Sequence, residues 1–513
     1  MNAQTASAHA AYPRRRGSGF RSLGVAALLA LGLSAPAHAI PQAERDVLLA
    51  FYNDMNGANW LRRTGWLGPA GTECSWYGVR CTPTNGNVES IILVENNLYG
   101  PLPVNLQDLS GLQTLDLDVN VFIGPMPPLA GLTKLRSLTL TQPYAYFTAG
   151  YGITGPLPPL DALTELENLT IVNNQISGDI PPLANLTKLQ LLNLASNRLS
   201  GPIPPLQGLS DLRYLNVPLN ALSGSIPSLT GLSSLVGIDI SSNQLTGTIP
   251  SLDNLTQLAS FQAYNNGLTG MPATLHNLPN LETLMVWNND LQGAFPAVNE
   301  LGRIRAIRAH GNRLTGSVPS ISGLTQLLLF YFDDNELSGE LPPLENVPAL
   351  YGYGVGGNRI TGSIPPLAHL TNLEFLYLNN NELSGAVPNM SALQKLHYLR
   401  LENNRLNSIA MLPRQLYEVD LNNNQFTGPF PSLYYMNYLM VIRAENNYFS
   451  GPPPVLPWNL GGLQPGWSSL CPNLFDNVPS SRWDTATGSA PWYQACQPPP
   501  DAIYADGFDA IGP

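Results

Sequence analysis

A leucine-rich motif recurs along most of this chain at a nearly constant period. The copy at residues 189–204 has the pattern L-x-x-L-x-L-x-x-N-x-L-x-G-x-I-P, and the next copy begins 23 residues later. A unit of this length cannot enclose its own leucines, so its apolar side chains are buried only when copies stack on one another. A fixed period of this kind therefore predicts a repeat solenoid rather than a set of separate globular domains.

The asparagine of the motif marks the phase of each copy. Between Asn174 and Asn404 the asparagines follow at intervals of 23 residues without exception, whereas the step from Asn404 to Asn424 is 20 residues. One further copy, between Asn120 and Asn174, has the leucines but no asparagine. We therefore expect sixteen coils, with asparagines at positions 96, 120, 174, 197, 220, 243, 266, 289, 312, 335, 358, 381, 404, 424 and 447.

Each position of the motif has a physical reason. The L-x-L segment alternates with period 2, which predicts a short strand with one buried face. The asparagine follows at an inward turn, where its amide needs backbone partners from its own coil and the next. The glycine suits a tight bend, and the proline suits a non-helical return segment. The motif thus predicts stacked strands and an internal ladder of asparagines.

This pattern resembles the plant-specific class of leucine-rich repeats from Val88 to Pro454. The preceding segment resembles the N-terminal cap of that family, in the run from Glu44 to Tyr52 and in the W-x-G-V-x-C ending at residues 76–81. The resemblance implies a leucine-rich-repeat superhelix, a repeat solenoid of the α/β class, with a parallel sheet on its concave side. It also implies extracellular recognition of peptides, proteins or glycans, as in receptor-like and polygalacturonase-inhibitor-like proteins. The alanine-rich leader and the short repeat before Asn424 indicate a bacterial secreted member.

The chain divides into five predicted segments. A basic start at Arg14–Arg16, an apolar stretch over residues 23–33 and the Ala37-His38-Ala39 site predict a signal peptide at 1–39. An N-terminal cap at 40–87, the repeats at 88–454, a C-terminal cap at 455–500 and a tail of unassigned role at 501–513 follow. The apolar stretch is shorter than the ~20 residues of a membrane-spanning helix. We expect a secreted, extracellular or cell-surface protein whose mature chain has no membrane span.

Charge and composition exclude two classes of protein. The chain has 24 Lys and Arg against 35 Asp and Glu, a net charge of −11, and only 12% of its residues are charged while 44% are hydrophobic. A charge-rich disordered protein would lack this apolar content. A nucleic-acid-binding protein needs a basic surface, so no nucleic-acid partner is expected.

The four cysteines, Cys74, Cys81, Cys471 and Cys496, lie outside the repeats. Sixteen strands at ~4.8 Å each form a rod about 75 Å long. Because a disulfide requires Cα atoms within about 7 Å, the expected pairs are Cys74–Cys81 and Cys471–Cys496. Each pair would close one end of the solenoid, and disulfides agree with export.

The residues that flank the strand leucines should form the concave surface. Counted back from each asparagine n, they are n−6, n−4, n−2 and n−1. Tyr, Trp and Arg are enriched at binding hot spots, and they gather in the middle coils. The predicted concave ligand-binding residues are Tyr264, Trp287, Arg308, His310, Tyr331, Asp333, Tyr377 and Arg400. The alternative is that the aromatic side chains only stack on one another and stabilise the solenoid.

Other polar groups suggest less specific chemistry. Glu95, Asp116 and Asp118 form an acidic group in the first coils, which we interpret as solvated acids rather than as a cation site. His310 and Asp333 could suggest acid–base chemistry, but an open sheet offers no desolvated pocket for it. We expect no catalytic residues, no metal and no cofactor.

An insertion of eight residues interrupts the coil after Leu140. Its aromatic residues Tyr144, Tyr146 and Phe147 are a second predicted ligand-binding group, since solenoid insertions often lie on the binding edge. The alternative is an aromatic knob that packs back on the coils. Glycosylation sequons begin at Asn168, Asn185, Asn254 and Asn389.

The sequence therefore predicts a secreted, non-catalytic recognition protein, not an enzyme. Its partner would be an extracellular protein, peptide or glycan bound by the concave face and the insert. Two alternatives stay open: a structural or adhesive cell-surface spacer, and an inhibitor of a wall-degrading enzyme.

Overall fold

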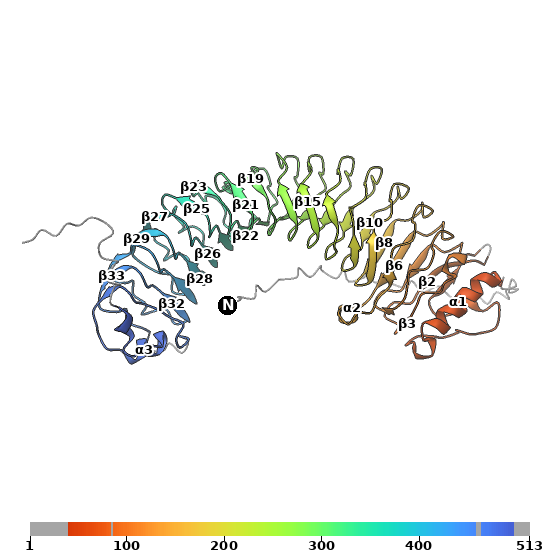
Figure 1. The fold of residues 1–513 in the computed structure, drawn as a ribbon, viewed down its shortest axis with the longest axis horizontal. Coiled ribbons are helices and arrows are strands. Elements are labelled where there is room, and N and C mark those ends of the chain that lie inside the picture. Colours follow the sequence, from red (N-terminus) through yellow and green to blue (C-terminus); the bar gives the residue numbers. More distant parts are fainter. Residues whose placement is uncertain (1–38, 84–85, 458–462, 497–513) are drawn as a thin grey trace, which may run out of the picture.

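The chain folds into a single arch of stacked coils (Figure 1). In this computed structural model the described residues are 39–83, 86–457 and 463–496. The predicted signal peptide and the predicted tail therefore lie outside the described residues, except for Ala39. Among the described residues, no helix has both the length and the apolar character needed to cross a membrane.

One long sheet lines the inner side of the arch. Its first strand, β1 (Val79–Cys81), pairs antiparallel with β2, and the remaining sixteen strands are parallel and follow in chain order. The predicted number of coils and the parallel sheet are confirmed, and the antiparallel β1 is an addition contributed by the cap. The parallel strands are β2 (Val88–Ile92), β4 (Thr114–Asp116), β6 (Ser137–Thr141), β8 (Asn168–Val172), β10 (Leu191–Asn193), β12 (Tyr214–Asn216), β14 (Gly237–Asp239), β16 (Ser260–Gln262), β18 (Thr283–Met285), β20 (Ala306–Arg308), β22 (Leu329–Tyr331), β24 (Gly352–Gly354), β26 (Phe375–Tyr377), β28 (Tyr398–Arg400), β30 (Glu418–Asp420) and β32 (Val441–Arg443).

A second set of short strands follows the motif asparagines and forms smaller parallel sheets along one rim. These strands are β3 (Tyr99–Gly100), β5 (Val121–Phe122), β7 (Thr154–Gly155), β9 (Gln175–Asp179), β11 (Arg198–Ser200), β13 (Ser223–Ser225), β15 (Gln244–Thr248), β17 (Gly267–Gly270), β19 (Gln292–Ala294), β21 (Arg313–Thr315), β23 (Ser338–Glu340), β25 (Arg359–Thr361), β27 (Ser384–Val387), β29 (Arg405–Ile409), β31 (Thr427–Gly428), β33 (Tyr448–Gly451) and β34 (Leu474–Phe475). Only short helical segments are described: α1 (Gln42–Asp54), α2 (Tyr144–Thr148), α3 (Ser481–Thr487), η1 (Gly57–Asn59), η2 (Glu73–Ser75), η3 (Leu106–Asp108) and η4 (Trp492–Ala495).

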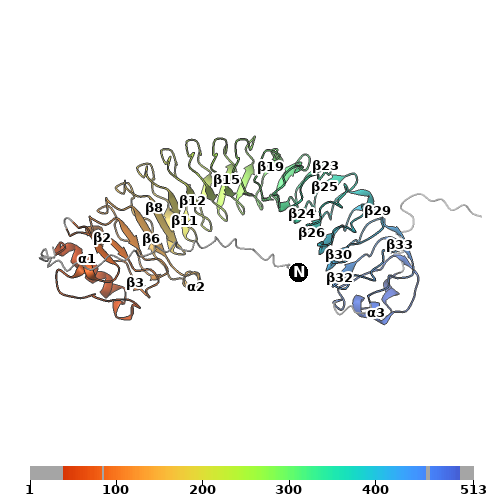
Figure 2. The same ribbon diagram turned by 180° about the vertical axis from the view of Figure 1, so that it is seen from behind.

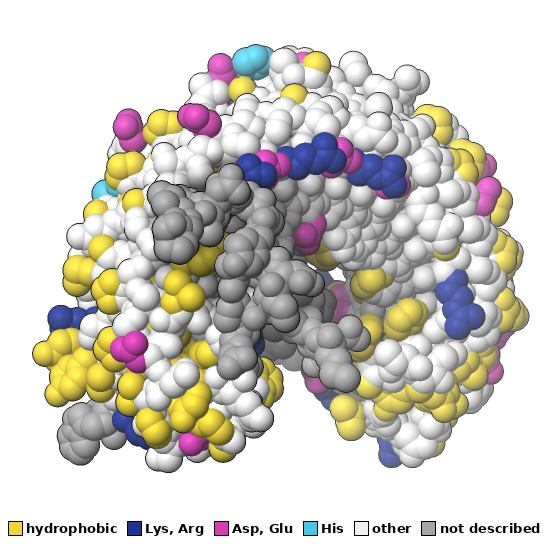
Figure 3. Space-filling view, turned by 60° about the vertical axis from the view of Figure 1, so that its left-hand side comes forward, with side chains coloured by type: hydrophobic (Ala, Val, Ile, Leu, Met, Phe, Trp, Pro, Cys, Tyr) yellow, Lys and Arg dark blue, Asp and Glu magenta, His cyan; other side chains and the backbone are white. Residues whose placement is uncertain are grey.

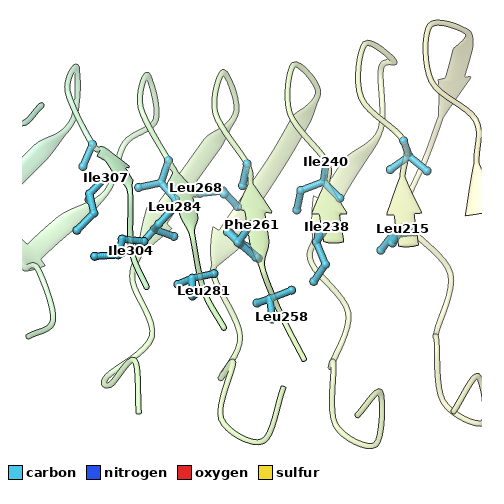
Figure 4. Packing of buried hydrophobic residues seen from close by; sticks show 14 of the residues in the cluster. Leu215, Ile238, Ile240, Leu258, Phe261, Leu268, Leu281, Leu284, Ile304 and Ile307 are labelled. Carbon is cyan, nitrogen blue, oxygen red and sulfur yellow. The ribbon is translucent and has the colours of Figure 1, made fainter. Parts of the chain in front are cut away.

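The core is a set of parallel rows of apolar side chains, one side chain per coil in each row. Leu281 and Leu284 are fully buried, and they lie beside Leu258 and Phe261 of the preceding coil (Figure 4). Each coil therefore buries its apolar side chains against those of its neighbours, as stacking of repeats requires.

The motif asparagines tie neighbouring coils together through backbone groups. Asn289 Nδ2 donates to the carbonyls of Val286 in its own coil (3.1 Å) and Ala263 in the preceding coil (3.0 Å). Its Oδ1 accepts from the amide of Leu268, also in the preceding coil (3.0 Å). The side chain is only 8% exposed. The predicted internal ladder is thus confirmed, because one amide satisfies three backbone groups that the turn leaves unpaired.

The asparagine ladder extends past the predicted end of the repeats, and in one coil glutamine side chains take the place of the asparagine. Asn473, within the predicted C-terminal cap, donates to Ala444 and accepts from the amide of Phe449 (2.9 Å). In the coil that has no asparagine, the carbonyl of Tyr151 accepts from the buried Gln142 of the same coil (2.7 Å) and from the buried Gln175 of the next coil (3.3 Å). In the coil that carries the insertion, longer amide side chains thus donate the hydrogen bond to the backbone.

Both ends of the core are closed by caps with disulfides. The pairs Cys74–Cys81 and Cys471–Cys496 are the predicted ones, with Cα–Cα distances of 5.4 and 4.4 Å. At the N-terminal end the buried Glu44 carboxylate of α1 accepts from the amide of Val88 (2.6 Å), which fastens the helix to the first coil. Burial raises the pKa of Glu44.

Replacing a ladder asparagine should destabilise the stack locally. Asn289→Ala leaves the buried amide of Leu268 without its acceptor, and it removes one of the two side-chain donors from the carbonyls of Val286 and Ala263. We expect a loss of about 1–3 kcal/mol in the free energy of unfolding. Urea unfolding measures the loss, and hydrogen exchange at Leu268 locates it. Asn288→Gly is the matched control, because Asn288 is exposed and its φ of 50° suits glycine. A loss no larger in Asn289→Ala than in Asn288→Gly would contradict the role of the ladder.

Candidate functional site

The concave surface consists of the outward residues of the long sheet, as the alternation predicts. In β18 and the residues that follow it, Thr283, Met285 and Trp287 are partly exposed, whereas Leu284 and Val286 between them are buried. Positions n−6, n−4 and n−2 therefore form the surface that a ligand would meet. All eight predicted concave residues occupy these positions.

The n−1 position differs from the other three in its backbone conformation, and its place on the concave face stays a prediction. Every n−1 residue has a positive φ, for example Asn288 at 50°, Asp334 at 53° and Gly357 at 65°. These residues form the turn that directs the asparagine inward, and the left-handed conformation favours Asn, Asp and Gly there. Glu95 and Asp334 both occupy this turn position, and the backbone conformation explains the choice of residue for Asp334.

Three rings at n−2 form a continuous stack across three coils. The rings of Tyr264 and Trp287 are nearly parallel, with centroids 4.4 Å apart and an interplanar angle of 5°. Trp287 and His310 continue the stack at 5.2 Å and 9°. The ring stacking expected under the alternative to binding is therefore present. Both faces of Trp287 are covered, and only ring edges are available to a ligand.

The stack contains polar atoms that folding leaves unsatisfied. Trp287 Nε1, His310 Nδ1 and Arg308 Nε are buried and have no hydrogen-bond partner among the described residues. Burial and the Arg308 guanidinium lower the pKa of His310 to about 4, so its imidazole is neutral at neutral pH. Within the described chain, His310 Nδ1 has no partner and the Asp333 carboxylate accepts from a backbone amide instead, so the two side chains show no acid–base geometry.

A strand with glycine at its outward positions, β24, forms the floor of the central concave face. In the coil of Asn358 all the concave positions are glycine, including Gly352, Gly354 and Gly356. A Cβ at Gly352 would overlap the hydroxyl of Tyr331, and a Cβ at Gly354 would overlap the carboxylate of Asp333. The missing side chains thus allow Tyr331 and Asp333 to lean over β24. The run G-Y-G-V-G-G-N marks this floor in the sequence, although the floor was not predicted.

Two arginine–tyrosine pairs lie on either side of the glycine floor. The Arg308 guanidinium carbon lies 5.7 Å from the ring centroid of Tyr331, and that of Arg400 lies 5.3 Å from Tyr377. Both distances are within the range of a cation–π interaction. Burial raises the pKa of Tyr331, and it raises that of Tyr377 to about 12. The order Arg–Tyr–Gly–Tyr–Arg along row n−4 is therefore nearly symmetric about Gly354.

Two carboxyls near this floor are desolvated. Burial raises the pKa of Asp333 to about 7, although its Oδ1 accepts from the amide of Gly356 (2.9 Å). Burial and the neighbouring Asp420 raise the pKa of Glu402 to about 7. Glu402 Oε2 is buried and unpaired among the described residues. Ionising these groups in water-excluded surroundings costs free energy, so they reduce the stability of the free protein.

The last coils carry paired charges instead. Arg443 Nη1 contacts Asp420 (2.8 Å) and Glu418 (3.1 Å), and Arg400 contacts Glu418 (3.5 Å). These side chains neutralise one another, so the C-terminal part of the concave face offers fewer free charges than the middle.

The early acids behave as expected from partial burial. Burial raises the pKa of Asp116 and Asp118, and each adds to the acidic character of the first coils. In the described parts of the chain, no group of three or more His, Cys, Asp or Glu side chains is arranged to hold a metal ion. The interpretation as simple acids stays a prediction.

The insertion forms the short helix α2 at the edge of the arch near β3, in both views (Figures 1 and 2). Tyr144 and Tyr146 are 62% and 43% exposed, and Phe147 is partly buried. Tyr146 contacts Tyr151 edge-on, and Tyr151 contacts Tyr99, two coils earlier, at 6.2 Å. The insert thus packs on the coils at its base and exposes its tip. The structure does not bring it together with the central concave residues.

A row of aromatic side chains at the start of the late strands was not predicted as a group. Phe375 and Tyr398 stack at 5.1 Å, Tyr398 contacts Tyr417 at 6.0 Å, and Tyr417 contacts Tyr438 at 6.1 Å. Phe375 and Tyr398 lie at the concave position n−6, and Phe375 also contacts Tyr377 of the same strand (6.2 Å). The recurrence of aromatic residues at n−6, n−6, n−7 and n−9 in four consecutive late coils was the signal available.

Comparison with known proteins identifies the same repeats. Residues 41–82 match the leucine rich repeat N-terminal domain, residues 164–208 match two copies of leucine rich repeats, and residues 372–392 match one leucine rich repeat. A 118-residue segment is 31% identical to a probable leucine-rich repeat receptor-like serine/threonine-protein kinase of Arabidopsis thaliana, covering 20% of this chain and 11% of the kinase. A 76-residue segment is 33% identical to MDIS1-interacting receptor like kinase 1 of the same plant, covering 15% of this chain and 7% of the kinase. The matched segments thus span roughly a tenth of these relatives, and both relatives are plant proteins, which gives no support to the expected bacterial source.

Two solved structures have a similar fold over most of the chain. A TDR receptor has a TM-score of 0.52 at 26% identity, covering 76% of this chain and 85% of that one. The Arabidopsis receptor kinase HAESA ectodomain, in complex with an extended IDA peptide hormone, has a TM-score of 0.54 at 22% identity, covering 85% and 95%. The repeats and the overall arch agree: this chain folds as a leucine-rich-repeat superhelix, and its residues 41–82 are similar to the leucine rich repeat N-terminal domain.

Proposed function

We propose that this protein is a secreted, non-catalytic recognition protein that binds an extended peptide, or an extended segment of a protein, along the concave face. The observation that carries the proposal is the concentration of unsatisfied groups between the coils of Asn289 and Asn404. Trp287, Arg308 and His310 each have a buried polar atom without a partner among the described residues, and Asp333 and Glu402 are desolvated. Groups of this kind reduce stability, so folding alone does not account for them.

The geometry of the rings favours a peptide over a glycan. Sugars stack on an open aromatic face, but Tyr264 and His310 cover the two faces of Trp287. Ring edges, the Arg308 guanidinium group and the desolvated carboxyls instead suit the amides and charged ends of an extended chain. A ligand that turned these side chains slightly would supply the missing hydrogen-bond partners.

The length of this surface suits a short segment. From the coil of Asn266 to that of Asn404 there are six steps of about 4.8 Å, a path of roughly 29 Å. An extended chain rises about 3.3 Å per residue, so about eight or nine residues would span it. The similarity to a TDR receptor over 76% of this chain supports recognition as the role of the arch.

Removing the central side chains should abolish binding without unfolding the arch. A random peptide library displayed on phage is selected against the immobilised protein, and the affinity of the enriched peptides is measured by calorimetry. We expect Trp287→Ala and Tyr331→Ala to weaken binding at least roughly tenfold, as for hot-spot residues.

Tyr435→Ala is the matched control, because Tyr435 is an exposed aromatic residue outside the concave positions. It should leave the affinity within about twofold. Peptides that bind both concave variants as tightly as the original protein would refute concave-face recognition, and failure to enrich any peptide would favour a spacer.

The desolvated carboxyl should make stability depend on pH in a defined direction. The folded state raises the pKa of Asp333 to about 7, so it binds this proton more tightly than the unfolded chain does. The cost of ionisation is therefore absent near pH 4, grows as the pH rises and is complete above about pH 7. Asp333→Asn keeps an acceptor for Gly356 and should stabilise the protein by about 1–3 kcal/mol near pH 8, with little gain near pH 4.

Urea unfolding at the two pH values measures this difference. Asp334→Asn, at the exposed turn position next door, controls for the loss of one negative charge. An equal gain for Asp333→Asn at both pH values would show that the carboxyl is not desolvated in the folded protein.

A further inference from the structure

A row of six charged residues of strictly alternating sign lies along one rim of the arch. These residues directly follow the motif asparagines of six consecutive coils, at position n+1. The row consists of Asp290, Arg313, Glu336, Arg359, Glu382 and Arg405. Gly267 precedes it and Gln425 follows it at the same position, so the row has uncharged limits. We refer to these six residues as the charge ladder.

The ladder is built from ion pairs between neighbouring coils. Arg313 contacts Asp290 at 3.0 Å, and the same contact recurs at 3.2 Å between Arg359 and Glu336. Arg405 contacts Glu382 at 2.9 Å. Figure 3 shows basic and acidic side chains alternating along one rim of the arch. Because exposed ion pairs contribute little to stability, the pairs by themselves do not require strict alternation over six coils.

The charge ladder is open to a partner. The side chains of its six members are between 42% and 67% exposed. The turn residues beside it are small or polar, among them Asn288, Gly311 and Gly357. None of the four glycosylation sequons begins at this rim, since they begin at residues 168, 185, 254 and 389. The rim is thus a polar strip without bulky obstacles.

An alternating row with an even number of members is complementary to itself under a two-fold rotation. The rotation reverses the order of the row, so each acid of one copy meets a base of the other. Asp290 meets Arg405 of the second copy, Glu382 meets its Arg313, and the axis passes between Glu336 and Arg359. Two parallel copies in the same register would instead oppose like charges. The ladder therefore selects an isologous, antiparallel contact.

We propose that the charge ladder is a dimerisation surface whose partner is a second copy of this chain, bound rim to rim about a two-fold axis. The arch is shallow in the direction of view of Figure 1, so two copies can lie side by side along their rims. This contact leaves both concave faces open, and it does not depend on whether those faces bind a peptide.

The first test is the oligomeric state of the full chain as a function of salt. Sedimentation velocity should show a dimer at about 0.02 M NaCl. The dissociation constant should be at least tenfold higher at about 0.5 M NaCl, because salt screens exposed charges. A monomer at both salt concentrations overturns the proposal. A dimer that salt does not weaken also overturns it, since another surface would then hold the copies together.

Swapping the two charges of one ion pair tests the contact between copies without removing the ion pair inside the chain. The double variant Asp290→Arg with Arg313→Asp keeps an ion pair within the chain. It places like charges opposite Arg405 and Glu382 of the second copy, so the variant should be monomeric at low salt. The control swap, Glu336→Arg with Arg359→Glu, also keeps the internal pair, but it preserves every opposite-charge contact across the axis and should dimerise like the original protein.

A second charge swap, at the other end of the row, should restore the dimerisation that the first swap removes. Adding Glu382→Arg with Arg405→Glu to the Asp290/Arg313 swap makes all contacts across the axis favourable again, and the quadruple variant should dimerise. The two terminal double variants, each monomeric alone, should also form a mixed dimer. Equal melting temperatures show that each variant is folded. Dimerisation of the Asp290/Arg313 variant, or monomeric behaviour of the control swap, would contradict the two-fold arrangement.

Discussion

The buried side-chain amide at the start of each turn is the interaction on which this structure depends. The strands of the long sheet are mostly three residues long, and no coil encloses a core of its own. Asn289 and its equivalents satisfy one amide and two carbonyls that the turn leaves unpaired, and two of these three groups belong to the preceding coil. The same asparagine side chain thus closes its own turn and binds the neighbouring coil. The apolar rows then stabilise a stack whose register is already determined.

This requirement separates positions that the backbone controls from positions that are free to vary. The n−1 residue must adopt a left-handed conformation so that the asparagine can point inward, which explains the frequency of Asn and Gly there. The residues at n−6, n−4 and n−2 carry no such constraint. Their departure from small polar residues in the middle coils therefore has to be explained by contacts, and that is why Trp287, Tyr331 and Asp333 are informative about function.

The central concave face and the rim use charge in opposite ways. On the rim, acids and bases such as Glu336 and Arg359 neutralise each other in solvent. On the concave face, Asp333 and Glu402 are desolvated, and the buried Nε of Arg308 has no hydrogen-bond partner within the described residues. A solvated, self-complementary strip suits a reversible contact between copies. A desolvated, unbalanced surface suits a ligand that supplies the missing partners.

Much of the architecture could be predicted from the chain alone because the motif is local and repeated. The coil number, the parallel strands, the asparagine ladder and both disulfides follow from spacing and from the length of the stack, and the structure confirms them. The solvent-facing alternation was also readable, since a strand turns successive side chains to opposite faces.

Contacts between coils decided the rest, because residues 23 positions apart meet only after stacking. No single coil shows that Trp287 is covered on both faces, that glycines at β24 let Tyr331 and Asp333 lean over the strand, or that burial raises the pKa of Asp333. The alternating ladder from Asp290 to Arg405 was present in the sequence, yet only the parallel register places its members on one rim. The sequence by itself determined the repeating frame, whereas the tertiary structure decided which side chains are desolvated, stacked or paired, because those properties arise from neighbours that the chain brings together from separate coils.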